Sequence, residues 1–174
     1  MGQKIWIILL GLVIIGFLAN YFYKKPKFSN GESIPEFEAQ LINGESFKLS
    51  DLSGKYVLLD FWGSWCAPCR KESPELVKLY NKFNGKKFKD ADDFEIVSVA
   101  IETSEKSWKK AIDKDGLIWP YHIPQMERFK SPIATQFRVR EVPTKYLLNE
   151  KSEIIAVNLS INEIAKMLEN RLKN

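Results

Sequence analysis

Residues 56–69 read YVLLDFWGSWCAPC, and this stretch decides the fold of the 174-residue chain. Its first half is apolar and rich in residues that favour β-strands. Its second half ends in Cys66 and Cys69, the only two cysteines present. Apolar residues then recur at helical spacing from Arg70 to Phe83. The stretch therefore predicts a buried strand, a short turn, and a helix that begins at the cysteines.

Within one molecule the two cysteines can pair only with each other, because the chain has no third thiol. A C-x-x-C pair at a strand-to-helix junction is typical of a thiol–disulfide redox centre. The alternatives are a static disulfide or half of a zinc site, and a structural zinc ion needs four ligands. His122 is the only histidine that could join such a site, and we expect it to be a structural or surface residue.

An uncharged run of 19 residues, Ile5 to Tyr23, precedes the rest of the chain and is apolar except for two glycines and Asn20. As a helix it would be about 28 Å long, close to the hydrocarbon thickness of a bilayer. The alternative is a cleaved signal peptide, but only Ala19 fits the small-residue rule for cleavage. We therefore expect residues 5–23 to be a single-pass anchor in the lipid bilayer, between a flank (1–4) and a tether (24–32).

Basic residues flank the anchor, whereas the domain that follows (33–174) is electrically neutral. The formal charge is +4, all 22 acidic residues lie after Asn30, and lysines 4, 24, 25 and 27 account for the excess. No net basic surface remains to hold nucleic acid. The positive-inside rule alone slightly favours a cytoplasmic domain. We nevertheless expect the domain on the extracytoplasmic, periplasmic side of the cell membrane, because disulfides persist in oxidising compartments.

Strands and helices alternate in this domain between two hairpins, the first around Asn43-Gly44. The segment 86–93 is charged and is expected to be a solvated connector. The whole order predicts an α/β sandwich around a mixed sheet. The other expected elements are hairpin strands at 34–41 and 46–49, a strand at 94–101, a helix at 104–114, hairpin strands at 144–148 and 153–157, and a helix at 161–172.

The chain resembles the thioredoxin superfamily, and more narrowly the membrane-anchored TlpA/ResA-like thiol–disulfide oxidoreductases, over residues 33–172. The resemblance rests on the motif from Asp60 to Cys69, on Glu72 and Pro74 in the following helix, and on Val142-Pro143-Thr144. It implies a thioredoxin-like three-layer sandwich with a mixed sheet. The narrower family adds an N-terminal β-hairpin and an insertion, which here lies between Ile101 and Gln136.

Position and resemblance together imply the catalytic roles. Unpaired amides and the helix dipole favour a thiolate at Cys66, which we expect to be the exposed nucleophile that attacks a partner's disulfide. Cys69, one turn further on, is expected to resolve the mixed disulfide. Pro68 pre-sets the helical backbone between them. Asp60 matches the buried aspartate of thioredoxins and Glu72 the active-site glutamate of the ResA-like branch. Either could move the Cys69 proton if burial raises its pKa.

Pro143 matches the cis-proline that faces the cysteines in this superfamily. The implied loop would expose the Val142 backbone to pair with an extended substrate chain. Trp65 is expected to be a partly exposed platform beside the site, and Trp62 is expected in the core. The substrate-binding residues that the resemblance implies are Trp65, Pro68, Val142, Pro143 and Thr144.

The resemblance implies that the protein reduces disulfides of extracytoplasmic proteins after being reduced itself by a membrane thiol reductant. Cytochrome c maturation is one setting it implies. We expect a monomer that needs no metal and no cofactor beyond the Cys66–Cys69 disulfide. One alternative is a non-enzymatic copper-binding metallochaperone, a class with a C-x-x-x-C pair and a later histidine. Another is a thiol peroxidase, which would need a hydroxyl residue where Gly63 stands.

Overall fold

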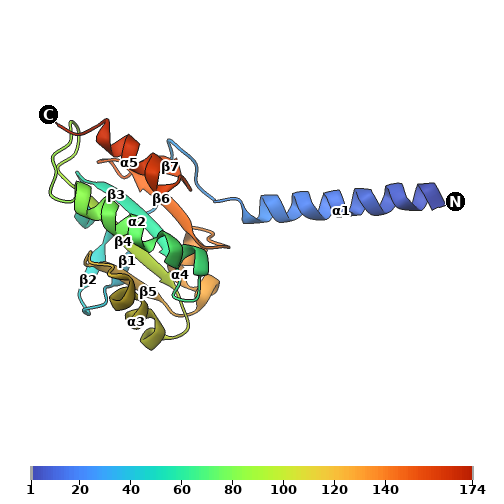
Figure 1. Cartoon of the computed structure of the whole chain (residues 1–174), viewed down its shortest axis with the longest axis horizontal. Coiled ribbons are helices and arrows are strands. Elements are labelled where there is room, and N and C mark those ends of the chain that lie inside the picture. The colour runs from blue at the N-terminus through green and yellow to red at the C-terminus, as the bar shows by residue number, and fades with distance from the viewer. Residues whose placement is uncertain (1, 174) are drawn as a thin grey trace.

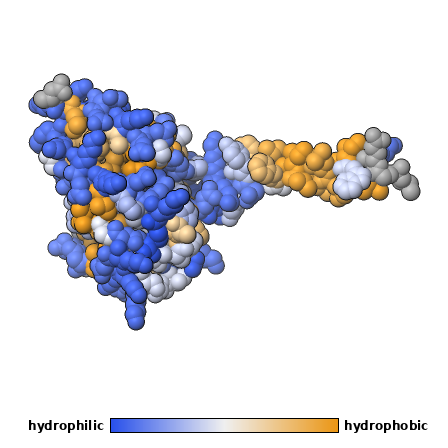
Figure 2. Space-filling view, in the orientation of Figure 1, coloured by the Kyte–Doolittle hydropathy of each residue, from blue (hydrophilic) through white to orange (hydrophobic). Residues whose placement is uncertain are grey.

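The computed structural model describes residues 2–173, which form a long N-terminal helix and one α/β domain (Figure 1). The helix α1 (Gly2–Lys24) projects away from the domain. Its apolar side chains from Ile5 to Tyr23 are exposed, and Figure 2 shows them as a mostly orange surface. By length and composition the span Lys4–Lys24 could cross a membrane, a test that a signal sequence near the N-terminus would also pass.

A five-stranded sheet in the order β5-β4-β3-β6-β7 forms the centre of the domain. β3, β4 and β5 are parallel, whereas β6 is antiparallel to β3 and β7 is antiparallel to β6. The sheet is therefore mixed, as the sequence predicts. The strands are β3 (Tyr56–Trp62), β4 (Phe94–Ile101), β5 (Tyr121–Gln125), β6 (Thr144–Leu148) and β7 (Ile154–Val157).

Both faces of the sheet are covered. Side chains alternate between the faces along each strand, and here both sets are mostly apolar, so each face packs against other elements. Leu58 and Trp62 of β3 belong to one core cluster, and Leu59 and Phe61 belong to the other. Three helices cover the first face: α2 (Ala67–Phe83), α3 (Glu105–Asp115) and α5 (Ile161–Glu169). The second face is covered by the hairpin β1 (Glu38–Gln40) and β2 (Ser46–Lys48), the short helix η1 (Leu49–Leu52) and α4 (Pro132–Gln136).

β5 was not expected as a strand, since it lies in the stretch expected to be an insertion. Pro124 interrupts its pattern, and a proline inside a run argues against a central strand. The strand forms because β5 is at the edge of the sheet and pairs only with β4, where Pro124 lies opposite Ala100. The N-terminal hairpin is confirmed, although its paired strands are only three residues long.

The segment 86–93 exposes most of its charged side chains, as expected of a solvated connector, but Phe88 and Ala91 anchor it to the core. Phe88 is buried, and its ring contacts Tyr56 edge-on at 5.0 Å between centroids. Phe88 also forms a backbone bridge with Leu172. The closing helix therefore ends at Glu169, earlier than expected, because the residues after it pair with this segment.

Phe137 occupies the centre of the second core and is fully buried. Replacing it with alanine should lower the free energy of unfolding by about 3–5 kcal/mol, because the cavity leaves several aromatic contacts unmade. Urea unfolding of the full chain in detergent, followed by tryptophan fluorescence, measures this. Lys106→Ala on the exposed face of α3 is the control and should change stability by less than about 0.5 kcal/mol. A similar loss in both variants would contradict the assignment. The rings around Phe137 are Phe28, Phe37, Phe61 and Tyr146.

Candidate active site

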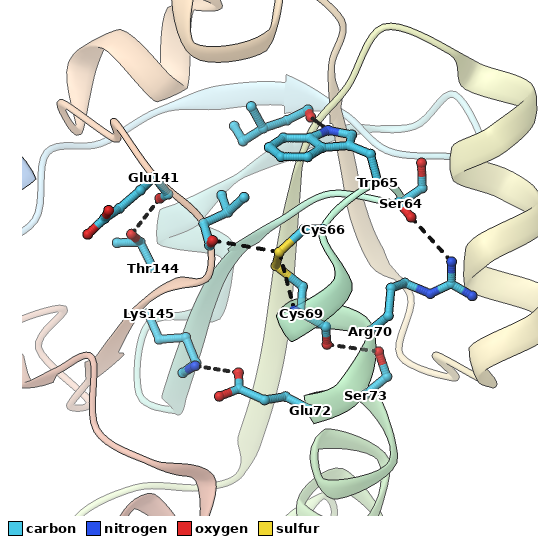
Figure 3. The surroundings of a disulfide bond; sticks show 12 residues. Ser64, Trp65, Cys66, Cys69, Arg70, Glu72, Ser73, Glu141, Thr144 and Lys145 are labelled. Carbon is cyan, nitrogen blue, oxygen red and sulfur yellow. Dashed lines mark hydrogen bonds and ion pairs between the residues drawn. A yellow bond between two sulfur atoms is a disulfide. The ribbon is translucent and has the colours of Figure 1, made fainter.

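The two cysteines form a disulfide at the N-terminus of α2 (Figure 3). Cys66 is the N-cap residue of this helix, and its Sγ accepts a hydrogen bond from the backbone N–H of Cys69 at 3.2 Å. Pro68 lies in the first turn, where a missing N–H leaves no helical hydrogen bond unmade. The helix begins at the cysteines as the sequence predicts, and Cys66 receives the amide hydrogen bond of a helix cap.

Each cysteine is only 4% exposed. The expectation that Cys66 would be an exposed thiol is therefore wrong for this disulfide form. The reason is the facing loop, which brings the carbonyl oxygen of Val142 to 3.6 Å from Cys66 Sγ.

This facing loop is placed by the sheet. β6 runs antiparallel to β3, so that Thr144 at its start lies opposite Phe61 near the end of β3. The residues just before Thr144 therefore lie beside the cysteines, which follow β3. The Val142–Pro143 peptide bond is cis, which confirms the prediction. Thr144 Oγ1 donates a hydrogen bond to the carbonyl oxygen of Glu141 at 2.8 Å and closes the turn.

Trp65 forms a fixed platform beside the disulfide. It is 43% exposed, whereas Trp62 is buried, so both predictions are confirmed. The Trp65 indole Nε1–H donates to the carbonyl oxygen of Ile101 at 2.7 Å. The Arg128 guanidinium lies over its ring at 4.7 Å from the centroid, a contact that the sequence did not reveal. A Cβ on Gly63 would lie 2.7 Å from Trp65 Nε1, so this position needs glycine.

One ion pair and two hydrogen bonds to the Ser64 backbone hold the turn before α2. The Arg70 guanidinium binds Asp115 of α3, with Nη2 at 2.6 Å from Oδ1, and also donates to the carbonyl oxygen of Ser64. The backbone N–H of Ser64 donates to the buried carboxylate of Glu102. The cysteine turn is therefore tied to α3 and to the end of β4.

Asp60 lies in the middle of β3 and is 3% exposed. Burial raises its pKa to about 7; the nearby Lys145 ammonium opposes this rise and the Glu72 carboxylate adds to it. A carboxyl group with this pKa can exchange a proton near neutral pH. Asp60 therefore meets the condition expected from the sequence for a carrier of the Cys69 proton, a pKa raised by burial.

Lys145 is the buried charged residue of the site that sequence reasoning missed beside Asp60. It lies opposite Asp60 on β6, and its Nζ is 2.6 Å from Glu72 Oε2. The Lys145 side chain is 5% exposed and that of Glu72 is 32% exposed. A lysine in a strand is usually a surface residue, so only the pairing of β6 with β3 reveals its burial.

His122 is buried on β5, where its ring stacks on Trp119 at 5.6 Å between centroids. Its Nε2 lies 3.1 Å from the carbonyl oxygen of Leu117. Burial lowers its pKa to about 4. His122 is therefore a structural residue, one of the two roles expected for it. Within residues 2–173, no three His, Cys, Asp or Glu side chains are grouped so that they could hold a metal ion.

The mixed sheet, the helices on its faces, and a C-x-x-C disulfide opposite a cis-proline define a protein of the thioredoxin-like class. Residues 30–157 match the model of the AhpC/TSA family. The chain belongs to this family.

Its relatives include named redox proteins. It is 33% identical over 151 residues to the thioredoxin-like protein YneN of Bacillus subtilis, covering 85% of this chain and 82% of that protein. It is 30% identical over 162 residues to the thiol-disulfide oxidoreductase ResA of Halalkalibacterium halodurans, covering 90% and 86%. The crystal structure of the thioredoxin domain of a thiol-disulfide oxidoreductase from Bacteroides vulgatus superposes with a TM-score of 0.70 at 31% identity, covering 82% and 99%. The protein is a thiol–disulfide oxidoreductase of thioredoxin-like fold, which confirms the resemblance.

The buried Asp60 makes the stability of the disulfide form depend on pH. Its pKa is about 7 in the folded chain and about 3.9 when unfolded, so the folded form binds more protons between these values. The contribution of protonated Asp60 to the free energy of unfolding is therefore fully present below a pH of about 4 and is lost as the pH rises through about 7. Asp60→Asn should abolish this loss and be more stable than the parent at pH 8, by on the order of 4 kcal/mol.

Urea unfolding at pH 4, 6 and 8 without reductant checks this prediction. Asp115→Asn is a control for loss of a carboxylate that is paired with an arginine, and it should be destabilising at pH 8. Equal stability of Asp60→Asn and the parent at pH 8 would mean that ionising the buried Asp60 carboxyl group does not lower the stability of the fold.

Proposed function

We propose that this protein reduces disulfides of extracytoplasmic proteins, with Cys66 as the attacking thiolate and Cys69 as the resolving thiol. The observation that carries the assignment is the cap of α2: the Cys69 N–H donates to Cys66 Sγ. In the reduced protein the same amide and the helix dipole would stabilise negative charge on Cys66 and not on Cys69.

The proposed reaction has two exchange steps. The Cys66 thiolate attacks one sulfur of the client's disulfide, so that a mixed disulfide forms and one client thiolate leaves. Cys69 then gives up its proton and attacks Cys66 Sγ, which releases the second client thiolate and forms the Cys66–Cys69 disulfide. Two electrons have passed to the client. A thiol reductant in the membrane restores the dithiol, and no cofactor or metal takes part.

Asp60 and Glu72 are the proposed acceptors of the Cys69 proton. Asp60 has the pKa suited to proton exchange near neutral pH. Glu72 is three residues after Cys69 on α2, on the same side of the helix as that cysteine.

The proposed client site lies between the Trp65 platform and the cis-proline loop. Val142, Pro143 and Thr144 would hold an extended client segment by backbone pairing, while Trp65 and Pro68 would flank the sulfur that is attacked. Cytochrome c apoprotein is the client that the family resemblance suggests.

The order of the two cysteines can be tested with single variants. Cys69→Ala should accumulate a mixed disulfide with its client, because nothing resolves the bond on Cys66. Cys66→Ala is the matched control and should trap none, since its remaining thiol lies inside the helix. Both should lose insulin reduction, and mass spectrometry of complexes trapped in membranes should identify the clients. Trapping by Cys66→Ala in place of Cys69→Ala would reverse the assignment.

The direction of electron flow is tested by the reduction potential of the Cys66–Cys69 pair. A reductant should lie toward about −270 mV, whereas a value near about −120 mV would indicate an oxidant. Tightly bound copper in a protein without insulin reduction would favour the metallochaperone alternative. Rapid peroxide consumption would favour the peroxidase alternative.

Membrane attachment through residues 5–23 is part of the proposal and is supported by the exposed apolar surface of α1. The full chain should stay in the membrane pellet after alkaline extraction and dissolve only in detergent. Protease added outside spheroplasts should digest the domain. A soluble protein whose N-terminus begins after Ala19 would contradict the anchor and indicate a cleaved signal peptide.

A further inference from the structure

Lys145 is a buried cation close to the redox pair, and the proposed reaction leaves it without a role. Its side chain is 5% exposed and forms an ion pair of 2.6 Å with Glu72 (Figure 3). Removing an ammonium group from water is costly unless nearby groups compensate. The two carboxyl groups that can compensate this charge are those of Glu72 and Asp60, the proposed proton acceptors. Glu72 binds the ammonium directly, and Asp60 is the cross-strand neighbour of Lys145.

The backbone of Lys145 is fixed. β6 lies between β3 and β7, so neither edge of this strand is free. The Lys145 N–H donates to Asn158 Oδ1 at 2.8 Å, and the Asn158 N–H donates to the Lys145 carbonyl oxygen at 2.9 Å. The ammonium group can therefore leave the site only by moving its side chain, and the ion pair with Glu72 opposes that motion.

The other elements around Asp60 contribute no further charge to it. From β4, Ser98 lies opposite Asp60, and its hydroxyl oxygen accepts a hydrogen bond from Trp119 Nε1 at 3.0 Å. From α5, the buried side chains are apolar. From α2, Glu72 reaches Lys145, and Cys69 lies one turn earlier on the same side of the helix. The Ser73 hydroxyl donates to the Cys69 carbonyl oxygen. The charged groups that act on Asp60 are Lys145 and Glu72.

We propose that Lys145 is a positioning residue that gives the two carboxyl groups different roles. It holds Glu72 as an ion-paired carboxylate. Asp60 is then the group that accepts the Cys69 proton. This inference rests on the proposed function, in which Cys69 must lose a proton to resolve the mixed disulfide. Lys145 touches neither the client nor the sulfur atoms in this assignment and acts through the carboxyl groups.

The proposal predicts effects of opposite sign for two substitutions. Without the ammonium group, the Glu72 carboxylate acts on Asp60 with no opposing cation, so Asp60 holds its proton to higher pH. Without the Glu72 charge, the ammonium group faces Asp60 alone, so Asp60 loses its proton at lower pH. A charge within about 4–6 Å typically moves the pKa of a carboxyl group by about one unit or more.

The experiment follows the resolving step alone. The reduced full chain in detergent reacts with the aromatic disulfide 5,5′-dithiobis(2-nitrobenzoate). Attack by Cys66 releases one coloured thiolate, and attack by Cys69 on the mixed disulfide releases the second. The rate of the second release is measured from pH 5 to 9 in the parent, Lys145→Met, Glu72→Gln and the double variant. Lys82→Met, which breaks the exposed pair with Glu169, is the matched control.

Lys145→Met should move the pH midpoint of the second release up by about one unit. At pH values below the midpoints of parent and variant, the second release should then be about tenfold slower in the variant. Glu72→Gln should move the midpoint down, and the double variant should return it toward the parent value. Lys145→Arg and Lys82→Met should keep the parent profile. The first release should change little throughout.

A downward shift or no shift in Lys145→Met would overturn the proposal, and so would an upward shift in Glu72→Gln. If Lys145→Met fails to fold, as thermal unfolding would show, the Glu72→Gln arm still decides by its sign. Failure of the proposed function would look different: Cys69→Ala, which keeps only the Cys66 thiol, would then give no first release, whereas Cys66→Ala would give it.

Discussion

The pairing of β3 with β4 on one side and β6 on the other is the constraint on which the site depends. It fixes where β3 ends, and therefore where Cys66 begins α2. It also brings the Val142–Pro143 loop beside the disulfide, because β6 begins opposite the end of β3. The same pairing places Lys145 across from Asp60. The position of Cys66, the facing loop and the buried charges are thus three consequences of one strand register.

The parts of the site that the sequence predicted are those encoded locally. The strand, the turn and the helix around the cysteines follow from residues that are close together in the chain, and the burial of Trp62 and exposure of Trp65 follow from that motif. The cis bond at Pro143 could be expected only from the family resemblance, since proline alone rarely adopts it. The fold class followed because alternating strands and helices leave few arrangements.

The parts that the sequence did not reveal depend on contacts between distant segments. Lys145 is 85 positions after Asp60, and only the sheet register brings them together. β5 is hidden by Pro124, which is compatible with a strand only because β5 lies at the edge. The burial of Cys66 depends on Val142, 76 positions away. In each case the missing information is which segment covers or pairs with the residue.

The buried charges near the disulfide are better explained by reactivity than by stability. A buried ion pair is often no more stabilising than apolar residues of the same size, because desolvation offsets the Coulombic attraction. Asp60 lies in the strand that fills both cores, where an apolar side chain would pack without a charge to desolvate. What an apolar residue could not do is exchange a proton near neutral pH. Asp60, Lys145 and Glu72 thus put buried charges where apolar side chains could pack, and they include one carboxyl group whose pKa suits proton exchange near neutral pH.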